Sequence, residues 1–144
     1  GDVYKRQGLR TLDVRLDRHQ SNAMKVASFL SKNKKIKLLY PFKKGSLNYR
    51  LWKKYYNGAS GLMGLRIKSS KKKVIKFVNS LKLFGYGYSW GGFESLALHQ
   101  EIREQGDRSY LNLPKDEHIV RLHIGLEDPK DLIEDLRRSL KFIK

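Results

Sequence analysis

The feature that most constrains the fold is a strand that runs directly into a capped helix near the end of the chain. Within residues 118–124 every second side chain is a large apolar one: Val120, Leu122 and Ile124. This period of two is typical of a strand with one buried face. Asp128 is a good N-cap residue and Pro129 suits the first helical position, so a helix must begin there. A buried strand face followed at once by an amphipathic helix predicts a helix packed on a sheet.

Apolar periodicity and breakers place the remaining elements. Residues 42–60 are predicted to be a loop with a partly buried short helix, and the stretch between residues 88 and 118 a long loop. We expect helices at 11–31, from a cap at Ser69 or Ser70 to residue 81, and from 129 onward, with strands at 36–40, 63–67, 83–88 and 118–124. This order predicts the α+β class, with a mostly antiparallel sheet and helices on one face. Residues 1–7 show no apolar pattern, and we expect them to be a non-native remnant rather than part of the fold.

Composition excludes several classes of protein. The 144 residues suffice for one domain with its own core, and 40% hydrophobic residues make disorder untenable. Cysteine is absent, which removes disulfides, cysteine-ligated metals and thiol nucleophiles. No apolar run approaches the length that spans a bilayer, and the first residues do not look like a secretory signal. We therefore expect a cytoplasmic protein without a membrane partner.

The net charge of +17 comes from one region. Sixteen of the 31 basic residues lie between Lys32 and Lys82, where no acidic residue occurs. One interpretation is a surface for nucleic acid, since clustered lysines neutralise phosphates and release counterions. The other is a set of solvated lysine faces. The near absence of arginine, the residue that reads bases, favours the second interpretation and makes a nucleic-acid partner the weaker hypothesis.

A glycine-rich turn at residues 86–95 is the first candidate site. Gly91 and Gly92 beside Ser89 and Trp90 would allow the backbone and a hydroxyl to approach a small anion closely. The same pattern also fits a simple turn between two strands, with Trp90 filling the core. The residues alone leave both interpretations open.

Arg121 is the second candidate, because it stands in the middle of an apolar strand. A guanidinium there needs an anionic partner, and its fork suits a carboxylate. That partner is either a ligand or one of the chain's own acids, such as Glu94 or Glu127. No pair of the four histidines has the helical spacing of metal ligands, so we expect no metal site.

At these residues the chain resembles a known family. The strings YSWGGFES and HIVRLHIGLEDPKDLIEDL are similar to the C-terminal domain of the Cys/Met-metabolism enzymes that use pyridoxal phosphate. GLRTLDVRLDRHQSNAMKVASFL is similar to the helix that enters that domain, and YNGASGLMGLRIK to its first main strand. The resemblance covers residues 8–144. The Ser-Trp-Gly-Gly version is similar to the bacterial cystathionine β-lyase branch of the family.

The resemblance implies a role for four residues. Arg121 matches the arginine that clamps the substrate α-carboxylate, and Ser89 the serine beside the cofactor-bound lysine. Tyr88 and Trp90 match residues that line the substrate pocket, with the Trp90 backbone helping to hold the carboxylate. The resemblance implies no catalytic, cofactor-binding or metal-binding residue in this chain.

The resemblance also implies what this chain lacks. Residues 8–144 would be the C-terminal small domain of a fold-type I enzyme, and pyridoxal 5'-phosphate would be bound by the missing N-terminal domain. The whole enzyme, usually a homotetramer, would convert cystathionine to homocysteine, pyruvate and ammonia, and this fragment would be inactive alone. Another family activity (γ-lyase, γ-synthase or sulfhydrylase) is the alternative. The implied partners are the chain's own missing cofactor domain and an amino-acid substrate.

Overall fold

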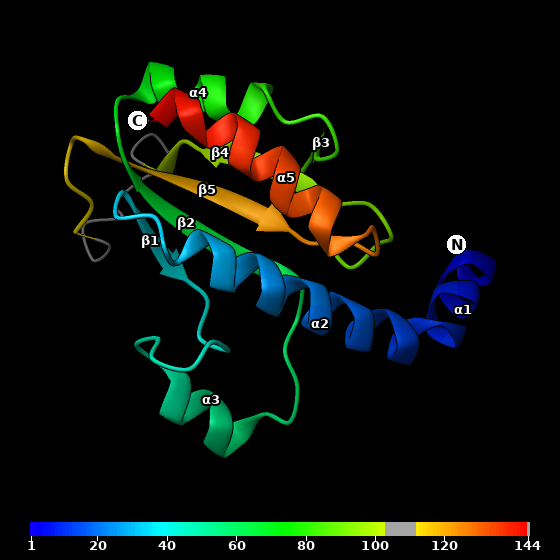
Figure 1. Ribbon diagram of the computed structural model, residues 1–144. Coiled ribbons are helices and arrows are strands. Elements are labelled where there is room, and N and C mark those ends of the chain that lie inside the picture. Colours follow the sequence, from blue (N-terminus) through cyan, green and yellow to red (C-terminus); the bar gives the residue numbers. More distant parts are fainter. Residues whose placement is uncertain (103–111, 144) are drawn as a thin grey trace.

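A single sheet organises the computed structural model, which describes residues 1–102 and 112–143 (Figure 1). Its five strands lie in the order β1-β2-β5-β4-β3. Their bounds are Ile36–Leu39 (β1), Leu62–Lys68 (β2), Gly85–Tyr86 (β3), Leu96–Gln100 (β4) and Glu117–His123 (β5). All neighbours are antiparallel except β3 and β4, which are parallel. The predicted α+β class with a mostly antiparallel sheet is confirmed.

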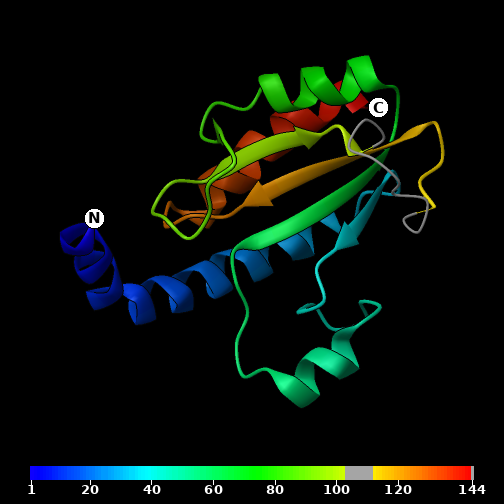
Figure 2. The same cartoon turned by 180° about the vertical axis from the view of Figure 1, so that it is seen from behind.

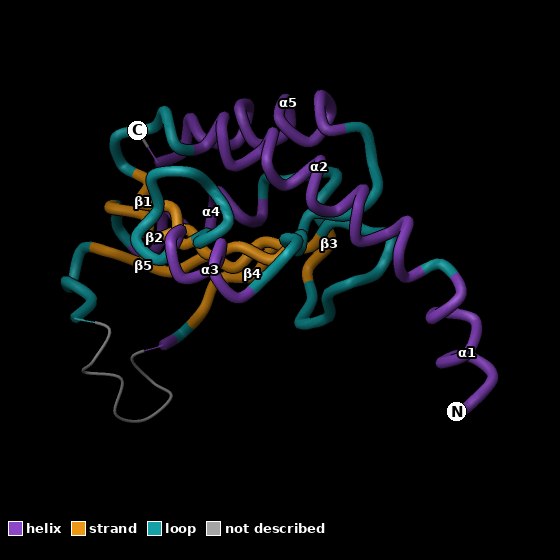
Figure 3. The backbone as a smooth tube through the Cα atoms, turned by 90° about the horizontal axis from the view of Figure 1, so that it is seen from below, coloured by secondary structure: helices purple, strands orange, loops and turns teal. Residues whose placement is uncertain are grey.

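Three helices cover one face of this sheet: α2 (Leu12–Leu30), α4 (Lys71–Asn79) and α5 (Pro129–Ser139). Figure 1 views the sheet from the helix side, Figure 2 shows the strands from behind, and Figure 3 shows α2 and α5 together above the strands. The fully buried core side chains come from both layers: Ala23, Val26, Ala27, Leu30, Leu65, Ile67, Val74, Phe77, Val120, Leu122, Ile124, Leu132 and Leu136. A short 3-10 helix, Leu140–Ile143, follows α5. The predicted alternation of Val120, Leu122 and Ile124 toward the core is confirmed.

The end of the chain forms as its caps predict. Asp128 is the N-cap of α5, and its carboxylate accepts a hydrogen bond from the Lys130 amide at 2.8 Å. Pro129 occupies the first turn. Ser70 stands at the N-cap of α4, as expected, but its hydroxyl makes no capping hydrogen bond. The α4 helix therefore depends on packing of its apolar face rather than on a side-chain cap.

Strand β4 is the main element that the sequence did not predict. It lies inside the stretch expected to be a long loop, of which residues 103–111 are outside the described part. Leu96, Ala97 and Leu98 are all buried, so the strand shows no polar alternation. In contrast, the expected strand at 83–88 is reduced to the two residues of β3.

Two further helices lie away from the core. Helix α1 (Asp2–Arg10) forms where we expected no regular structure, and none of its residues is buried. Apolar periodicity marks a face that packs on the core, and α1 packs no face there, so the sequence shows no such pattern. Helix α3 (Tyr49–Tyr55) is the predicted short helix; Trp52 is half-buried, but Tyr55 and Tyr56 are exposed.

The uncovered face of the sheet carries Arg121, the second candidate. Cα pairs across four strands align Leu39, Gly64, Arg121 and Leu98 in one row. Paired residues point to the same face, and the neighbours Val120 and Leu122 point into the core. Arg121 therefore projects from the central strand, away from the helices.

Candidate functional site

Arg121 contacts the backbone of the glycine-rich turn. Its Nη2 atom donates to the carbonyl of Gly87 at 3.3 Å and to that of Ser89 at 3.5 Å. Both distances are long, and a guanidinium has five N–H donors in all. Among the described residues no carboxylate lies within salt-bridge distance of Arg121. The alternative of an internal salt bridge to Glu94 or Glu127 is therefore wrong for this part of the chain.

The turn itself, residues 87–95, joins β3 to β4 and exposes its large side chains. Tyr88 is 69% and Trp90 67% exposed, and Ser89 is exposed as well. The interpretation of Trp90 as a core residue is therefore wrong, although the segment does connect two strands. The structure brings Ser89 and Arg121 together, as required if both are to meet one small anion.

Side chains from α2 and β5 hold the middle of the turn. Arg15 donates from Nη1 to the Gly91 carbonyl at 2.6 Å, and His19 Nε2 lies 2.8 Å from the Gly92 carbonyl oxygen. The Gly91 amide donates to His123 Nε2 at 3.2 Å. Gly91 has a φ of +81°, a conformation that glycine adopts without strain. The bend is thus fixed by three side chains.

Glu127 holds the end of the turn. Its carboxylate accepts hydrogen bonds from the amide of Ser95 at 2.7 Å and from the Ser95 hydroxyl at 2.8 Å. That hydroxyl in turn accepts from the Gly125 amide at 2.8 Å. A Cβ atom on Gly125 would lie 2.3 Å from the Phe93 carbonyl oxygen, so only glycine fits here. The end of β5 and the turn are therefore in direct backbone contact.

The sequence analysis missed the roles of Arg15, His19 and His123, and it named Glu127 only as a possible partner of Arg121 rather than of Ser95. Each acts on a segment between 31 and 76 residues away along the chain, so no local motif marks them. Only an expectation of which strands and helices pack together could have suggested them.

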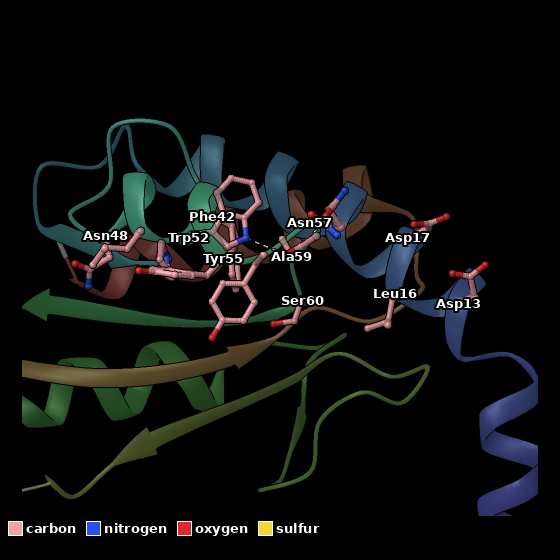
Figure 4. A pocket seen from close by; sticks show the side chains of 15 residues that line it. Asp13, Leu16, Asp17, Phe42, Asn48, Trp52, Tyr55, Asn57, Ala59 and Ser60 are labelled. Carbon is pink, nitrogen blue, oxygen red and sulfur yellow. Dashed lines mark hydrogen bonds between the residues drawn. The ribbon is translucent and has the colours of Figure 1, made fainter.

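A separate hollow of about 770 Å³ lies between α2 and α3. Figure 4 shows Phe42, Trp52 and Tyr55 on one side of it and Asp13 and Asp17 on the other. The Trp52 indole donates to the Gly58 carbonyl at 2.9 Å across its floor. None of the four predicted site residues lines this hollow.

The lysine-rich region is divided between distant parts of the molecule. Lys71, Lys72 and Lys73 lie on α4, whereas Lys53 and Lys54 lie on α3, at the opposite end in Figure 1. This distribution does not provide the single basic face that nucleic-acid binding requires. Of the helices that the structure describes, none is long and apolar enough to cross a bilayer.

Comparison with known proteins identifies the family. The family model described as "Cys/Met metabolism PLP-dependent enzyme" matches residues 3–141. The chain belongs to this family. The match begins at residue 3, within the segment that we expected to be a remnant.

The relatives have several different activities in their names. The chain is 42% identical over 137 residues to an L-alanine/L-glutamate racemase of Wolbachia pipientis, covering 93% of this chain and 34% of the racemase. It is 38% identical over 135 residues to a cystathionine β-lyase of Bordetella avium, covering 93% and 34%. A cystathionine γ-synthase structure from Xanthomonas oryzae pv. oryzae superposes with a TM-score of 0.84 at 29% identity, covering 95% of this chain and 36% of that one. The chain thus spans about a third of the length of these relatives.

Among the described residues, the groups gathered around Arg121 do not fit pyridoxal phosphate. The cofactor of this family needs a lysine amine at its aldehyde and donors around its phosphate. Every described lysine except Lys43 is exposed, and the groups that the structure places against the Arg121 guanidinium are backbone carbonyls rather than lysine amines. The residues assembled here fit a carboxylate better than they fit the cofactor.

Proposed function

We propose that this chain is the C-terminal, carboxylate-binding domain of a pyridoxal-phosphate-dependent carbon–sulfur lyase of the cystathionine β-lyase type. The observation that carries the proposal is the juxtaposition of Arg121 with Ser89 on the uncovered face of the sheet. The reaction would consume cystathionine and water and yield homocysteine, pyruvate and ammonia. A γ-lyase, γ-synthase or sulfhydrylase activity is the alternative, since relatives with different names align over the same stretch.

In this proposal Arg121 and the turn dock the α-carboxylate of an amino-acid substrate. Within the described part of the chain the guanidinium uses only Nη2, toward two weak carbonyl acceptors, and a carboxylate is a much stronger acceptor. The hydroxyl of Ser89 and the backbone of Trp90 would add donors from the other side, while Tyr88 and the Trp90 indole would line the pocket. Holding the carboxylate fixes the substrate so that its Cα–H bond faces the cofactor, which supplies the electron sink when bound.

The cofactor and its lysine belong, in our proposal, to an N-terminal domain outside this chain. The exposed aromatic side chains of β3 and the turn support it, since Tyr86, Tyr88, Trp90 and Phe93 are each at least two-thirds exposed. Large aromatic groups gathered in the open are typical of a surface that another protein part covers. We propose the same whole protein to be a cytoplasmic homotetramer.

The proposal is tested in two steps. The chain alone, supplied with pyridoxal phosphate and cystathionine, should release neither pyruvate nor thiol. In the longer protein, Arg121→Met should raise KM for the amino-acid substrate by about 100-fold, because charge-assisted hydrogen bonds to the carboxylate are lost. Arg18→Met, which changes an exposed arginine of α2, is the matched control. Turnover by the chain alone, or an unchanged KM in a folded Arg121→Met protein, contradicts the proposal.

A further inference from the structure

Two buried histidines meet beneath the bend of the turn. His19 of α2 is 1% exposed and His123 of β5 is 2% exposed. Their rings are nearly perpendicular, with centroids 4.9 Å apart. Both ring Nε2 atoms reach the Gly91–Gly92 backbone, at 2.8 Å for His19 and 3.2 Å for His123. Packing alone does not require two buried polar rings this close to one bend of the chain.

The hydrogen bonds assign opposite roles to the two rings. A backbone N–H can only donate, so the Gly91 amide requires a lone pair on His123 Nε2. This bond requires a neutral His123 with its proton on Nδ1, whereas the longer contact of the same Nε2 with the Gly92 carbonyl, at 3.4 Å, would require the proton on Nε2. A carbonyl can only accept, so the Gly92 oxygen requires a proton on His19 Nε2. These assignments follow from the network and can be measured directly.

The bond to His123 fixes a particular peptide plane. The Gly91 amide belongs to the peptide that joins Trp90 to Gly91, so its orientation sets ψ of Trp90. Arg15 fixes the following plane through the Gly91 carbonyl. The direction in which Trp90 and Ser89 present their backbone and side chains therefore depends on the acceptor at His123.

The surroundings of His123 favour its neutral form. Burial lowers the pKa of His123, and His19 and Arg121 lower it further, while the Gly92 carbonyl and Glu127 oppose them. Residues facing it from β2 and β4, Leu62 and Leu96, are apolar. Among the described residues, the carboxylate that acts on His123 is Glu127, which already accepts two hydrogen bonds from Ser95.

We propose that His19 and His123 are positioning residues that hold the turn in the geometry needed for carboxylate docking, and that this holding requires neutral His123. The role in carboxylate docking rests on the proposed function, whereas the contacts of the two histidines with the bend do not. Protonation would put a donor where the Gly91 amide needs an acceptor, and the new N–H could reach only the Gly92 carbonyl at 3.4 Å. Acid would thus release the bend and reduce carboxylate binding.

The first experiment measures the protons on this chain without any ligand. Long-range proton–nitrogen NMR of the imidazoles at neutral pH should show His123 protonated on Nδ1 and His19 on Nε2. The Gly91 amide resonance should then move with the titration of His123 as the pH falls. A proton on His123 Nε2 at neutral pH overturns the inference, whatever any variant does.

The second experiment separates holding from filling space. His123→Gln keeps an acceptor near the position of Nε2 but cannot titrate, whereas His123→Leu fills space without an acceptor. The Gly91 amide should keep its neutral-pH resonance position in His123→Gln and lose its pH response below about pH 7. It should shift at all pH values in His123→Leu. His118→Gln, on the same strand but the other face, is the matched control and should leave the Gly91 response intact.

The third experiment distinguishes this inference from the proposed function. In the longer protein, KM for the amino-acid substrate should rise at least 3-fold as the pH falls through the His123 transition, and His123→Gln should abolish that rise. If Arg121→Met leaves KM unchanged while the NMR pattern holds, the proposed function fails and the bend remains histidine-held. If Arg121→Met raises KM but the acid-induced rise persists in His123→Gln, the positioning role is overturned and the function stands.

Discussion

Two regions of this molecule expose large aromatic side chains, yet they are anchored in different ways. The turn at 87–95 is held by a carboxylate, a guanidinium and two buried imidazoles. The α3 region is held by neutral groups, with Trp52 donating to Gly58 and Gln20 accepting from the Ala59 amide. The two regions therefore expose similar aromatic side chains, but different kinds of groups hold their backbones. We conclude that the turn is built to keep one backbone geometry, whereas α3 provides an apolar wall.

The largest expected effect comes from the closest backbone contact of the turn. Gly125→Ala would place a Cβ atom 2.3 Å from the Phe93 carbonyl oxygen, so β5 and the turn must separate. We expect a loss of about 3 kcal/mol in the free energy of unfolding, measured by urea denaturation. Gly92→Ala lies in the same turn and meets nothing within 4 Å, so it should cost less than about 1 kcal/mol. Equal losses would show that the contact at Gly125 is not what fixes the turn.

The next effect concerns the charged anchor. Glu127→Ala removes the acceptor for both the amide and the hydroxyl of Ser95, which is fully buried. Leaving these donors unpaired should cost about 2 kcal/mol of unfolding free energy. Glu134→Ala changes an exposed glutamate paired with Arg137 on α5 and should cost no more than about 0.5 kcal/mol. If the two glutamates prove equivalent, the turn is not anchored as described.

The neutral anchor of the α3 region should matter less. Gln20→Ala removes the acceptor of the Ala59 amide, a single uncharged hydrogen bond. We expect a loss of about 1 kcal/mol, roughly half that of Glu127→Ala, in the same denaturation experiment. A loss larger than that of Glu127→Ala would reverse the ranking of the two regions.

The sequence predicted the elements that carry a local signal. The cap at Asp128, the alternation in 118–124 and the apolar faces of α2 and α4 each report a contact that the element itself makes. Strand β4 was missed because it is buried on both faces, so apolar and polar residues do not alternate there. Helix α1 was missed for the opposite reason, since it buries nothing.

The candidate site was predictable only in part, for a related reason. Arg121 was noticeable because a cation in an apolar strand is costly, and the glycines marked the turn. The partners that fix the turn come from α2 and from the end of β5, and their side chains look ordinary in sequence. Asn22, for example, bonds the carbonyls of Gly125 and Glu127 across more than a hundred residues. Only the packing of α2 beside the end of β5 reveals this.

The smallest expected effect is on pH dependence, and the two tryptophans of the chain can resolve it by region. Trp90 reports on the turn and Trp52 on the hollow, whose lining contains no histidine.

Because burial lowers the pKa of His123 in the folded state, the unfolded chain binds the proton more readily. Stability from this group is therefore complete above the unfolded value of about 6.5 and is lost as the pH falls toward the lowered folded value. As the pH falls below about 6.5, Trp90 fluorescence in a Trp52→Phe protein should change, and Trp52 fluorescence in a Trp90→Phe protein should stay constant. A parallel change in both would mean that acid loosens the whole domain rather than the histidine-held bend.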